Sequence, residues 1–493
     1  MSRVRLPAWS MEYAVCFVTG FVILVLELVA FRLLAPYFGI SNQVTGIIIN
    51  GILLAMAIGY LLGGYAADRK RSPGLPYLAI LLSTLYLTAV YATYGPMLQL
   101  LTGYPLISGV SAAVVLMFFL PITLLAIVPP YFIKTISSEQ GVGKTAGGIY
   151  ALSTLGSILG GLSTTFFFIP LLGSRNTFLL AILCLLMISL PALWGMTRLA
   201  APLSLLAVPL LLPLSDRQLV QQLYRGESEY NLITVTEQGG DRFLHLNHQF
   251  GQHSKSLDPQ TMLSGYYYDD FLFPQMLVNA DTTLILGNGA GTVMTQTGYF
   301  FPTRIDGVEI DSQLTRIGQT YFDLKPSLRH KIFHEDARRF VNQSDRTYDV
   351  ICVDVYAGGP YVPFHVASVE FYQRLRQMLS ADGILAVNIP FFSSGTELAE
   401  YFHNTIARVF PDSTYVFENM LYGFNSRTER AELRDRIAQA NLPQELKDLG
   451  KKILTDLRWI EVKHTNKIFT DDQAPVAMLT DQALRTTSGS PIE

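Results

Sequence analysis

The feature that most constrains this chain is a succession of long apolar runs confined to its first 214 residues. We place six of them near 12–36, 43–66, 75–94, 107–133, 146–170 and 175–195. A helix needs about 20 mostly apolar residues to cross the hydrocarbon core of a bilayer, and these runs are about that long. A seventh run, 199–214, contains three prolines and is shorter. We therefore expect residues 1–214 to form a transmembrane domain of six or seven spans.

Charge is distributed as unevenly as hydropathy. Residues 1–214 contain ten Lys or Arg and four Asp or Glu, which gives a net charge of +6. The rest of the chain contains 26 Lys or Arg and 35 Asp or Glu, which gives a net charge of −9. Only 15% of all residues are charged, against about 25% in typical soluble proteins. This composition excludes a simple soluble enzyme, a disordered chain and a nucleic-acid-binding protein. The acidic second part is long enough to bury a core of its own.

Basic residues indicate how the spans are oriented. If six spans alternate, most charged loop residues fall on one side: Arg3, Arg5, Asp68, Arg69, Lys70, Arg71, Lys134, Lys144 and Arg198. The short loops of the other side contain only Arg175. The positive-inside rule makes the first side cytoplasmic, so we expect a multi-pass protein of the cell (inner) membrane, embedded in the lipid bilayer. The second part is cytoplasmic if 199–214 stays on that side, and external if this run crosses.

The membrane part contains a weak internal repeat. Pro-Tyr-Phe occurs near the ends of the first and fourth runs, at 36–38 and 130–132. The second and fifth runs share a Gly-xxx-Gly-Gly pattern, at 59–64 and 156–161. A repeat of three spans inverts its orientation in the membrane, as in many transporters. The alternative for the glycines is that small residues merely let helices pack closely.

After residue 214 the pattern becomes that of a globular α/β protein. Residues 230–237 and 242–249 alternate like paired strands, which predicts a small antiparallel β subdomain within 215–280, followed by an aromatic helix. Within 281–485, five buried strands separated by helical stretches are expected near 283–286, 305–310, 331–334, 350–355 and 384–388. This alternation predicts an α/β, Rossmann-like doubly wound sheet. The expected fold class is thus a multi-pass α-helical membrane domain followed by a Rossmann-like domain with a small β subdomain at its start.

Polar residues and glycines gather where the expected strands end, which is where ligands bind in such sheets. Four consecutive strand ends supply Gly287, Gly289, Gly291, Glu309, Asp311, Asp336, Ala337 and Asp354. The glycines allow a tight turn and a close approach of the backbone to a ligand. An acid about 20 residues after such a turn suits a ribose diol, and a carboxylate after the third strand can accept from an adenine amino group. Together they indicate a nucleoside site, although each acid alone could equally cap a helix.

With these motifs the sequence resembles the spermidine synthase family in its membrane-fused form. The resemblance also rests on 348–351, Phe371-Tyr372 and 470–476 in the second part, and on Glu27, 32–41 and 150–156 in the first. It implies a class I S-adenosylmethionine-dependent transferase fold and an enzyme of polyamine biosynthesis. Such an enzyme transfers an aminopropyl group from decarboxylated S-adenosylmethionine to an amine such as putrescine, releasing methylthioadenosine.

The resemblance also implies roles for individual residues. Glu309 would hold the ribose, Asp336 the adenine, and Asp354 would take the proton of the acceptor. No metal and no tightly bound cofactor are needed. The donor is made in the cytoplasm, which favours that side for the second part. Soluble members form dimers or tetramers, so a homodimer is the assembly to expect unless membrane attachment changes it.

The chain departs from the family where amines bind. Ala290 and Ala357 stand where the family carries acids, and the substrate motifs near 257–270 have no clean match. The candidates left for the acceptor are Gln252, Tyr267, Asp269, Asp270 and Tyr356. Two alternatives therefore stay open: an S-adenosylmethionine-dependent methyltransferase acting on a membrane-associated substrate, and a transporter with a nucleoside-binding domain.

Two smaller groups of residues bear on these alternatives. Glu27 and Arg32 lie inside the first run, where ionisable groups are costly and are candidates for transport, for a structural ion pair or for interface contacts. The histidines at 245, 248 and 253 lack the spacing of a metal site, so we interpret them as surface or pocket residues.

Overall fold

A computed structural model describes residues 9–39, 42–69, 72–194, 221–247, 252–357, 359–389, 395–411, 413–460 and 466–487. The run 199–214 and His248 lie outside these ranges. The chain divides into two compact units, Met1–Arg217 and Gln218–Glu493. Each is described here by itself.

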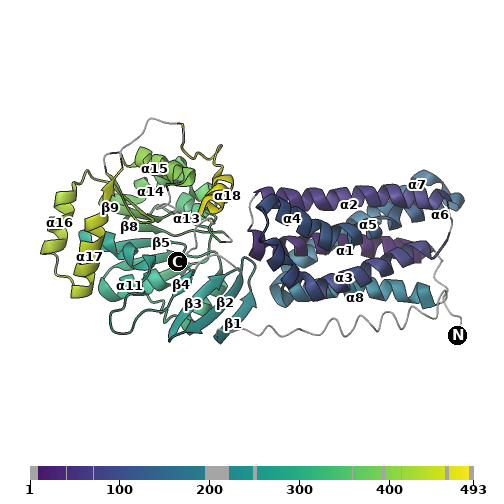
Figure 1. Ribbon diagram of the computed structural model, residues 1–493, viewed down its shortest axis with the longest axis horizontal. Helices are drawn as coiled ribbons and strands as arrows, with labels where there is room; N and C mark the ends of the chain where they lie inside the picture. Colours follow the sequence, from purple (N-terminus) through teal and green to yellow (C-terminus); the bar gives the residue numbers. More distant parts are fainter. Residues whose placement is uncertain are drawn as a thin grey trace. The chain divides into compact units, whose positions relative to one another are not determined.

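The first unit is helical (Figure 1). Its described helices are α1 (Trp9–Phe38), α2 (Asn42–Arg69), α3 (Leu75–Leu101), α4 (Leu106–Val114), α5 (Leu120–Ala126), α6 (Val128–Gln140), α7 (Val142–Ser163) and α8 (Ile169–Trp194). Two π-helical turns, η1 (Val115–Phe119) and η2 (Thr164–Phe168), join α4 to α5 and α7 to α8. Five stretches of the described residues are long and apolar enough to cross a membrane. The last of them, Val142–Ser189, is broken at Gly173, whose φ of +77° interrupts the helix between the fifth and sixth predicted runs.

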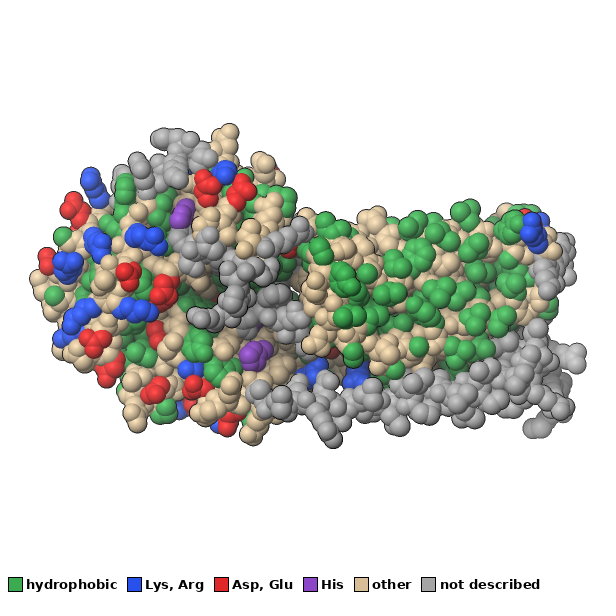
Figure 2. All heavy atoms as spheres, viewed as in Figure 1, with side chains coloured by type: hydrophobic (Ala, Val, Ile, Leu, Met, Phe, Trp, Pro, Cys, Tyr) green, Lys and Arg blue, Asp and Glu red, His purple; other side chains and the backbone are tan. Residues whose placement is uncertain are grey.

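Glycines bring two pairs of these helices into backbone contact. A Cβ added to Gly156 of α7 would lie 2.1 Å from the carbonyl oxygen of Phe17 in α1. A Cβ on Gly59 of α2 would lie 2.4 Å from that of Thr123 in α5. Only glycine fits at such distances, so both Gly-xxx-Gly patterns pack helices closely. Figure 2 shows the outward face of this unit as a broad band of apolar side chains, whereas charged side chains are scattered over the second unit.

The second unit begins with a four-stranded antiparallel sheet in the order β1-β2-β3-β4. Its strands are β1 (Gln221–Glu227), β2 (Leu232–Gln238), β3 (Asp241–Leu246) and β4 (Ser254–Lys255). Two of them, β2 and β3, correspond to the predicted pair, which turns at Gly239 and Gly240 with positive φ angles. Apolar side chains of this sheet pack with Leu314 and Ile317 of the helix α12 (Ser312–Tyr321), which places the small sheet beside the main one.

The main sheet has eight strands in the order β12-β10-β11-β9-β8-β5-β6-β7. They are β5 (Thr282–Leu286), β6 (Arg304–Val308), β7 (His330–Phe333), β8 (Tyr348–Val353), β9 (Leu379–Asn388), β10 (Thr414–Phe417), β11 (Met420–Phe424) and β12 (Arg458–Trp459). The five predicted strands, β5 to β9, are parallel, whereas β11, β10 and β12 continue the sheet in antiparallel pairs. The winding reverses between β5 and β8, which is the point where ligands bind in such sheets.

Helices cover both faces of this sheet (Figure 1). They are α10 (Phe273–Leu277), α11 (Thr292–Phe300), α12, α13 (Ala337–Gln343), α14 (Val369–Met378), α15 (Glu397–Val409), α16 (Arg430–Gln439), α17 (Gln444–Asp456) and α18 (Val476–Thr487), with short 3-10 helices η4 (Tyr267–Leu272) and η5 (Phe364–Val366). Leu284 and Leu286 of β5 join the core under α13, α14, α15 and α18. Ile285 between them joins the core under α11, α16 and α17. Alternate residues of one strand thus bury both faces, which explains the continuous apolar runs in the sequence.

Candidate active site

The glycine loop after β5 forms one wall of the candidate site. Gly287, Gly289 and Gly291 all have positive φ angles, of +83°, +53° and +87°. The N–H group of Gly287 donates to the carbonyl oxygen of Val308, at the end of the neighbouring strand β6, over 3.0 Å. A Cβ on Gly287 would lie 2.1 Å from the carbonyl oxygen of Asp354. Glycine is therefore needed here to bring the ends of β5 and β8 together at the point where the winding reverses.

Glu309 closes this loop from the end of β6. Its carboxylate accepts from the N–H group of Gly289 over 2.7 Å and from that of Asp311 over 3.0 Å. The side chain is buried, and burial raises the pKa of Glu309 to about 7 even though the backbone N–H groups lower it. Because a carboxylate offers about four lone-pair sites, Glu309 can still accept from a hydroxyl group of a ligand.

The two other predicted nucleoside acids cap helices. Asp311 accepts from the N–H group of Gln313 at the start of α12 over 3.0 Å, and also from the hydroxyl of Ser228. Asp336 accepts from the N–H group of Arg339 at the start of α13 over 2.9 Å. The second oxygen of Asp336 lies 3.4 Å from His365 Nε2, and its side chain is 39% exposed, so it can still meet a ligand. The buried Ala337 follows as the first residue of α13, and ligand contacts of all three residues remain predictions.

Asp354 follows β8 and is held from two sides. Asn388, the last residue of β9, donates from Nδ2 to Asp354 Oδ1 over 2.9 Å. The hydroxyl of Tyr267 donates to Asp354 Oδ2 over 3.1 Å. Burial raises the pKa of Asp354 to about 6, and the hydrogen bonds from Asn388 and Tyr267 lower it. A carboxylate with a pKa this close to neutrality can accept a proton from a substrate at physiological pH and release it again.

Two of the predicted acceptor-binding residues, Tyr267 and Tyr356, lie beside Asp354, and Gln252 is connected to them through Tyr268. Tyr267 contacts Asp354 directly, and the ring of Tyr267 lies 4.1 Å from that of Tyr268, centroid to centroid. The hydroxyl of Tyr268 donates to the carbonyl oxygen of Gln252 over 2.5 Å. Tyr356 donates to the carbonyl oxygen of Asn388 over 3.1 Å. These contacts place Gln252, Tyr267 and Tyr356 in one neighbourhood.

Asp270 and Asp269 point elsewhere. The charges that act on Asp270 come from Glu418, Lys452 and Asp269 and not from Asp354, and burial raises its pKa to about 7. Asp269 accepts from Ser264 and from Gln296, over 2.6 and 2.5 Å, so its carboxylate fixes the loop before η4. The described hydrogen bonds of Asp269 and the charges that act on Asp270 thus do not involve Asp354, the residue that Tyr267 contacts.

Sequence reasoning missed two residues of the site. Asn388 carried a usable signal, because it ends the strand that follows Asp354 and strand ends of a parallel sheet share one edge. Ser254 carried no such signal, because it lies in β4, a strand of only two residues. Its hydroxyl accepts from the N–H group of Ala290 in the glycine loop over 3.0 Å. The histidines of the small sheet make local hydrogen bonds, His245 to Thr236 and His253 to Leu246. No group of three or more potential metal-ligating side chains occurs among the described residues.

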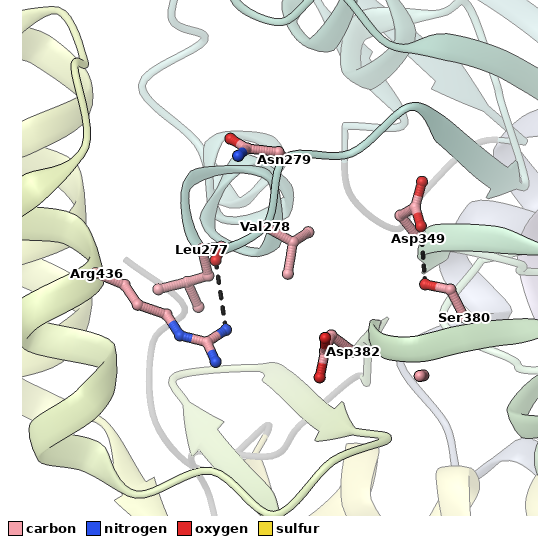
Figure 3. Close-up of a pocket in the computed structure, with 8 residues that line it drawn as sticks. Leu277, Val278, Asn279, Asp349, Ser380, Asp382 and Arg436 are labelled. Carbon is pink, nitrogen blue, oxygen red and sulfur yellow. Dashed lines mark hydrogen bonds between the residues drawn. The ribbon is translucent and has the colours of Figure 1, made fainter.

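A separate hollow of about 460 Å³ lies at the end of the main sheet where its parallel strands begin (Figure 3). Leu277, Val278, Asn279, Asp349, Ser380, Ala381, Asp382 and Arg436 line it. Asp349 near the start of β8 accepts from the hydroxyl of Ser380 in β9 over 2.8 Å and from the N–H group of Thr282 in β5 over 3.1 Å. Its carboxylate therefore ties together the beginnings of three strands, far from the ends that carry Asp354.

Comparisons with known proteins agree with this geometry. Residues 273–421 match the spermine/spermidine synthase domain. A probable polyamine aminopropyl transferase of Bifidobacterium longum is 31% identical over 278 residues, which cover 52% of this chain and 61% of the relative. The polyamine aminopropyltransferase of Corynebacterium efficiens is 26% identical over 424 residues, 78% of each chain. The chain spans 61%, 58% and 64% of the first three curated relatives that it matches.

Solved structures of the same kind are also similar. A probable spermidine synthase from Corynebacterium glutamicum has a TM-score of 0.37 and 19% identity, covering 49% of this chain and 96% of that one. A spermidine synthase in complex with the transition state analogue AdoDATO has a TM-score of 0.36 and 19% identity, covering 46% and 87%. Residues 273–421 therefore match a spermine/spermidine synthase domain, and apolar helices that fit a membrane-fused arrangement precede this match in the chain.

Proposed function

We propose that the protein is a membrane-bound aminopropyltransferase, which moves an aminopropyl group from decarboxylated S-adenosylmethionine to an amine. The observation that carries this proposal is Asp354, held by Tyr267 and Asn388 beside the glycine loop with a pKa of about 6. The names of the relatives support the same reaction. No bound cofactor enters it, because the donor is a co-substrate.

In this proposal, one end of the crevice would bind the nucleoside of the donor and the other end, at Asp354, would carry out the transfer. The free lone pairs of Glu309 would accept from the ribose hydroxyls, and the exposed oxygen of Asp336 from the adenine amino group. The glycine loop lets the backbone approach the nucleoside, because no Cβ stands in the way. In this arrangement the sulfonium carbon of the donor would lie on the Asp354 side of the loop.

At neutral pH an acceptor amine is mostly protonated and cannot attack. Asp354 would orient the amine and take its proton, while the nitrogen forms a bond to the aminopropyl carbon next to sulfur. The carbon–sulfur bond breaks, sulfur keeps its electron pair, and the positive charge of the sulfonium disappears as methylthioadenosine leaves. Holding both reactants in one crevice contributes a large part of the rate.

The first unit supports attachment to the cell membrane, with the second unit on the cytoplasmic side where the donor is made. We further propose that its six spans are a duplicated set of three. In the structure α1 packs on α7, and α2 packs on α5 and α6, each through a Gly-xxx-Gly pattern. If each of the first three spans is exchanged with its counterpart among the last three, the contact of α1 with α7 becomes the contact of α5 and α6 with α2. The contact of α3 with α8 stays the same under this exchange.

Product identification tests the enzymatic proposal. The full chain in detergent would receive decarboxylated S-adenosylmethionine with putrescine, and separately S-adenosylmethionine with membrane lipids. We expect methylthioadenosine in the first reaction, at a rate that Asp354→Asn lowers about 100-fold or more. Formation of S-adenosylhomocysteine instead would make the protein a methyltransferase, a reading that the neutral Ala290 and Ala357 favour. An Asp354→Asn variant as fast as the wild type would refute the assigned base.

A further inference from the structure

The surface around Asp354 is built from tyrosines. Tyr267, Tyr268 and Tyr356 surround it, and all three hydroxyl groups are already engaged, with Asp354, with Gln252 and with Asn388. What the partly buried Tyr267 and Tyr356 leave for a substrate is therefore mainly ring carbon, and the buried Tyr268 packs behind Tyr267. We call Tyr267, Tyr268 and Tyr356 the tyrosine wall.

Among the described residues, the carboxylate that contacts the tyrosine wall is that of Asp354. Asp269 and Asp270 follow directly in the sequence, but Asp269 is bound to Ser264 and Gln296 and Asp270 interacts with Glu418 and Lys452. Burial raises the pKa of each phenol of the wall, and the negative charge of Asp354 adds to each rise. Among the described residues, the hydroxyl groups of the wall thus bond one carboxylate, that of Asp354, and two backbone carbonyl oxygens.

The neighbouring sequence supplies no acid either. Ala357 follows Asp354 by three residues, and Ala290 lies in the glycine loop. Three stretches outside the described ranges adjoin wall residues or site residues in the sequence, at 248–251, 358 and 390–394, and contain neither Asp nor Glu. Among the residues that the structure describes, the carboxylate available to a bound amine is therefore that of Asp354.

The donor already carries one ammonium group on its aminopropyl chain, and a diamine brings two more, of which Asp354 can pair with one. The second would lose its hydration against ring carbon, and an unpaired buried ammonium is costly. The face of a tyrosine ring attracts a cation, but much less strongly than hydration or a carboxylate does. An apolar tail, in contrast, gains from contact with the same rings.

Given the proposed aminopropyl transfer, on which this step depends, we infer that the acceptor is a primary amine whose tail carries no second positive charge. Its amino group meets Asp354, and its alkyl or aromatic tail lies on the tyrosine wall. The chemistry of the transfer is unchanged: one nitrogen–carbon bond forms, one carbon–sulfur bond breaks, and Asp354 takes the proton.

A matched pair of acceptors tests this inference. Butylamine and 1,4-diaminobutane have the same four-carbon chain and differ by a methyl group or an ammonium group at the far end. With decarboxylated S-adenosylmethionine and the full chain in detergent, we expect kcat/KM per amino group to be about tenfold or more higher for butylamine. Equal values, or a preference for the diamine, would overturn the inference while leaving the aminopropyl transfer intact. Absence of methylthioadenosine with either amine would overturn both.

The substitution Gln252→Glu provides a converse test. The side-chain oxygen of Gln252 is buried and accepts no hydrogen bond from the described residues, so the isosteric carboxylate adds a charge beside the wall without removing a contact. We expect the ratio of kcat/KM values to shift toward the diamine by about tenfold. Gln252→Met, which adds no charge, should leave the ratio in place. A ratio that moves equally in both variants would mean that charge does not set the preference.

Discussion

Asn388 donates a hydrogen bond to Asp354 over 2.9 Å, although 34 positions of sequence separate the two residues. The contact exists because β8 and β9 are parallel neighbours that end at the same edge of the sheet. It ties the protonation of Asp354 to the side chain of a different strand.

We expect Asn388→Leu to raise the pKa of Asp354, because a donor to its charged form is lost while its burial remains. Wild-type kcat/KM should rise with pH through about 6, where Asp354 ionises. In the variant this rise should move to higher pH, with activity restored at alkaline pH. Tyr356→Phe is the control, because its hydroxyl bonds the Asn388 carbonyl and not Asp354. An unshifted profile in Asn388→Leu would contradict the role given to this contact.

Asp354→Asn should stabilise the protein at pH 8. The pKa of Asp354 is about 6 in the folded protein, above its ordinary value of 3.8, so ionisation costs folding free energy. This cost is absent below pH 3.8, grows between pH 4 and 6, and is complete above that range. The variant should therefore gain about 1–3 kcal/mol at pH 8 and much less at pH 4. Thermal unfolding in detergent at the two pH values measures the difference, and an equal gain at both would contradict it.

Gly156→Ala should destabilise the helical unit, because its Cβ would overlap the Phe17 carbonyl group and push α1 from α7. Gly147 lies on the same helix with nothing within 4 Å of an added Cβ, so Gly147→Ala is a matched control and should be neutral or slightly stabilising. The readout is the temperature at which the detergent-solubilised protein loses its monodisperse elution. Equal behaviour of the two variants would show that the close approach of α1 and α7 is unimportant.

Arg338→Met should weaken donor binding. Arg338 joins the first turn of α13, which Asp336 caps, to Asp471 over 2.8 Å and to Ser368 over 3.2 Å. Without these bonds Asp336 is less firmly placed, so the KM for the donor should rise about tenfold while the KM for the acceptor changes little. Steady-state kinetics with each substrate varied in turn separates the two effects. If kcat alone fell, Arg338 would not act through donor placement.

Sequence patterns predicted the parts of the fold in which local residues determine the outcome. The glycine loop and Asp354 follow strands whose apolar runs are continuous because both faces are buried. The antiparallel strands β10 and β11 were not predicted, because four or five buried residues in a row do not distinguish a strand from a buried helix turn. The direction of Asp269 could not be predicted either, because Gln296, which donates to its carboxylate, is distant in sequence.

The role of Asp349 has a consequence for how this protein would be studied by mutation. Its carboxylate aligns the beginnings of β5, β8 and β9, and Asp354 stands five residues further along β8, roughly 16 Å away. Loss of Asp349 should let these strands slide, so that the loop, Asp354 and Asn388 no longer meet. A mutational scan scored by activity alone would therefore rank Asp349 with the residues that touch substrate. Only a parallel score for protein abundance would separate a residue that aligns strands from one that takes part in the reaction.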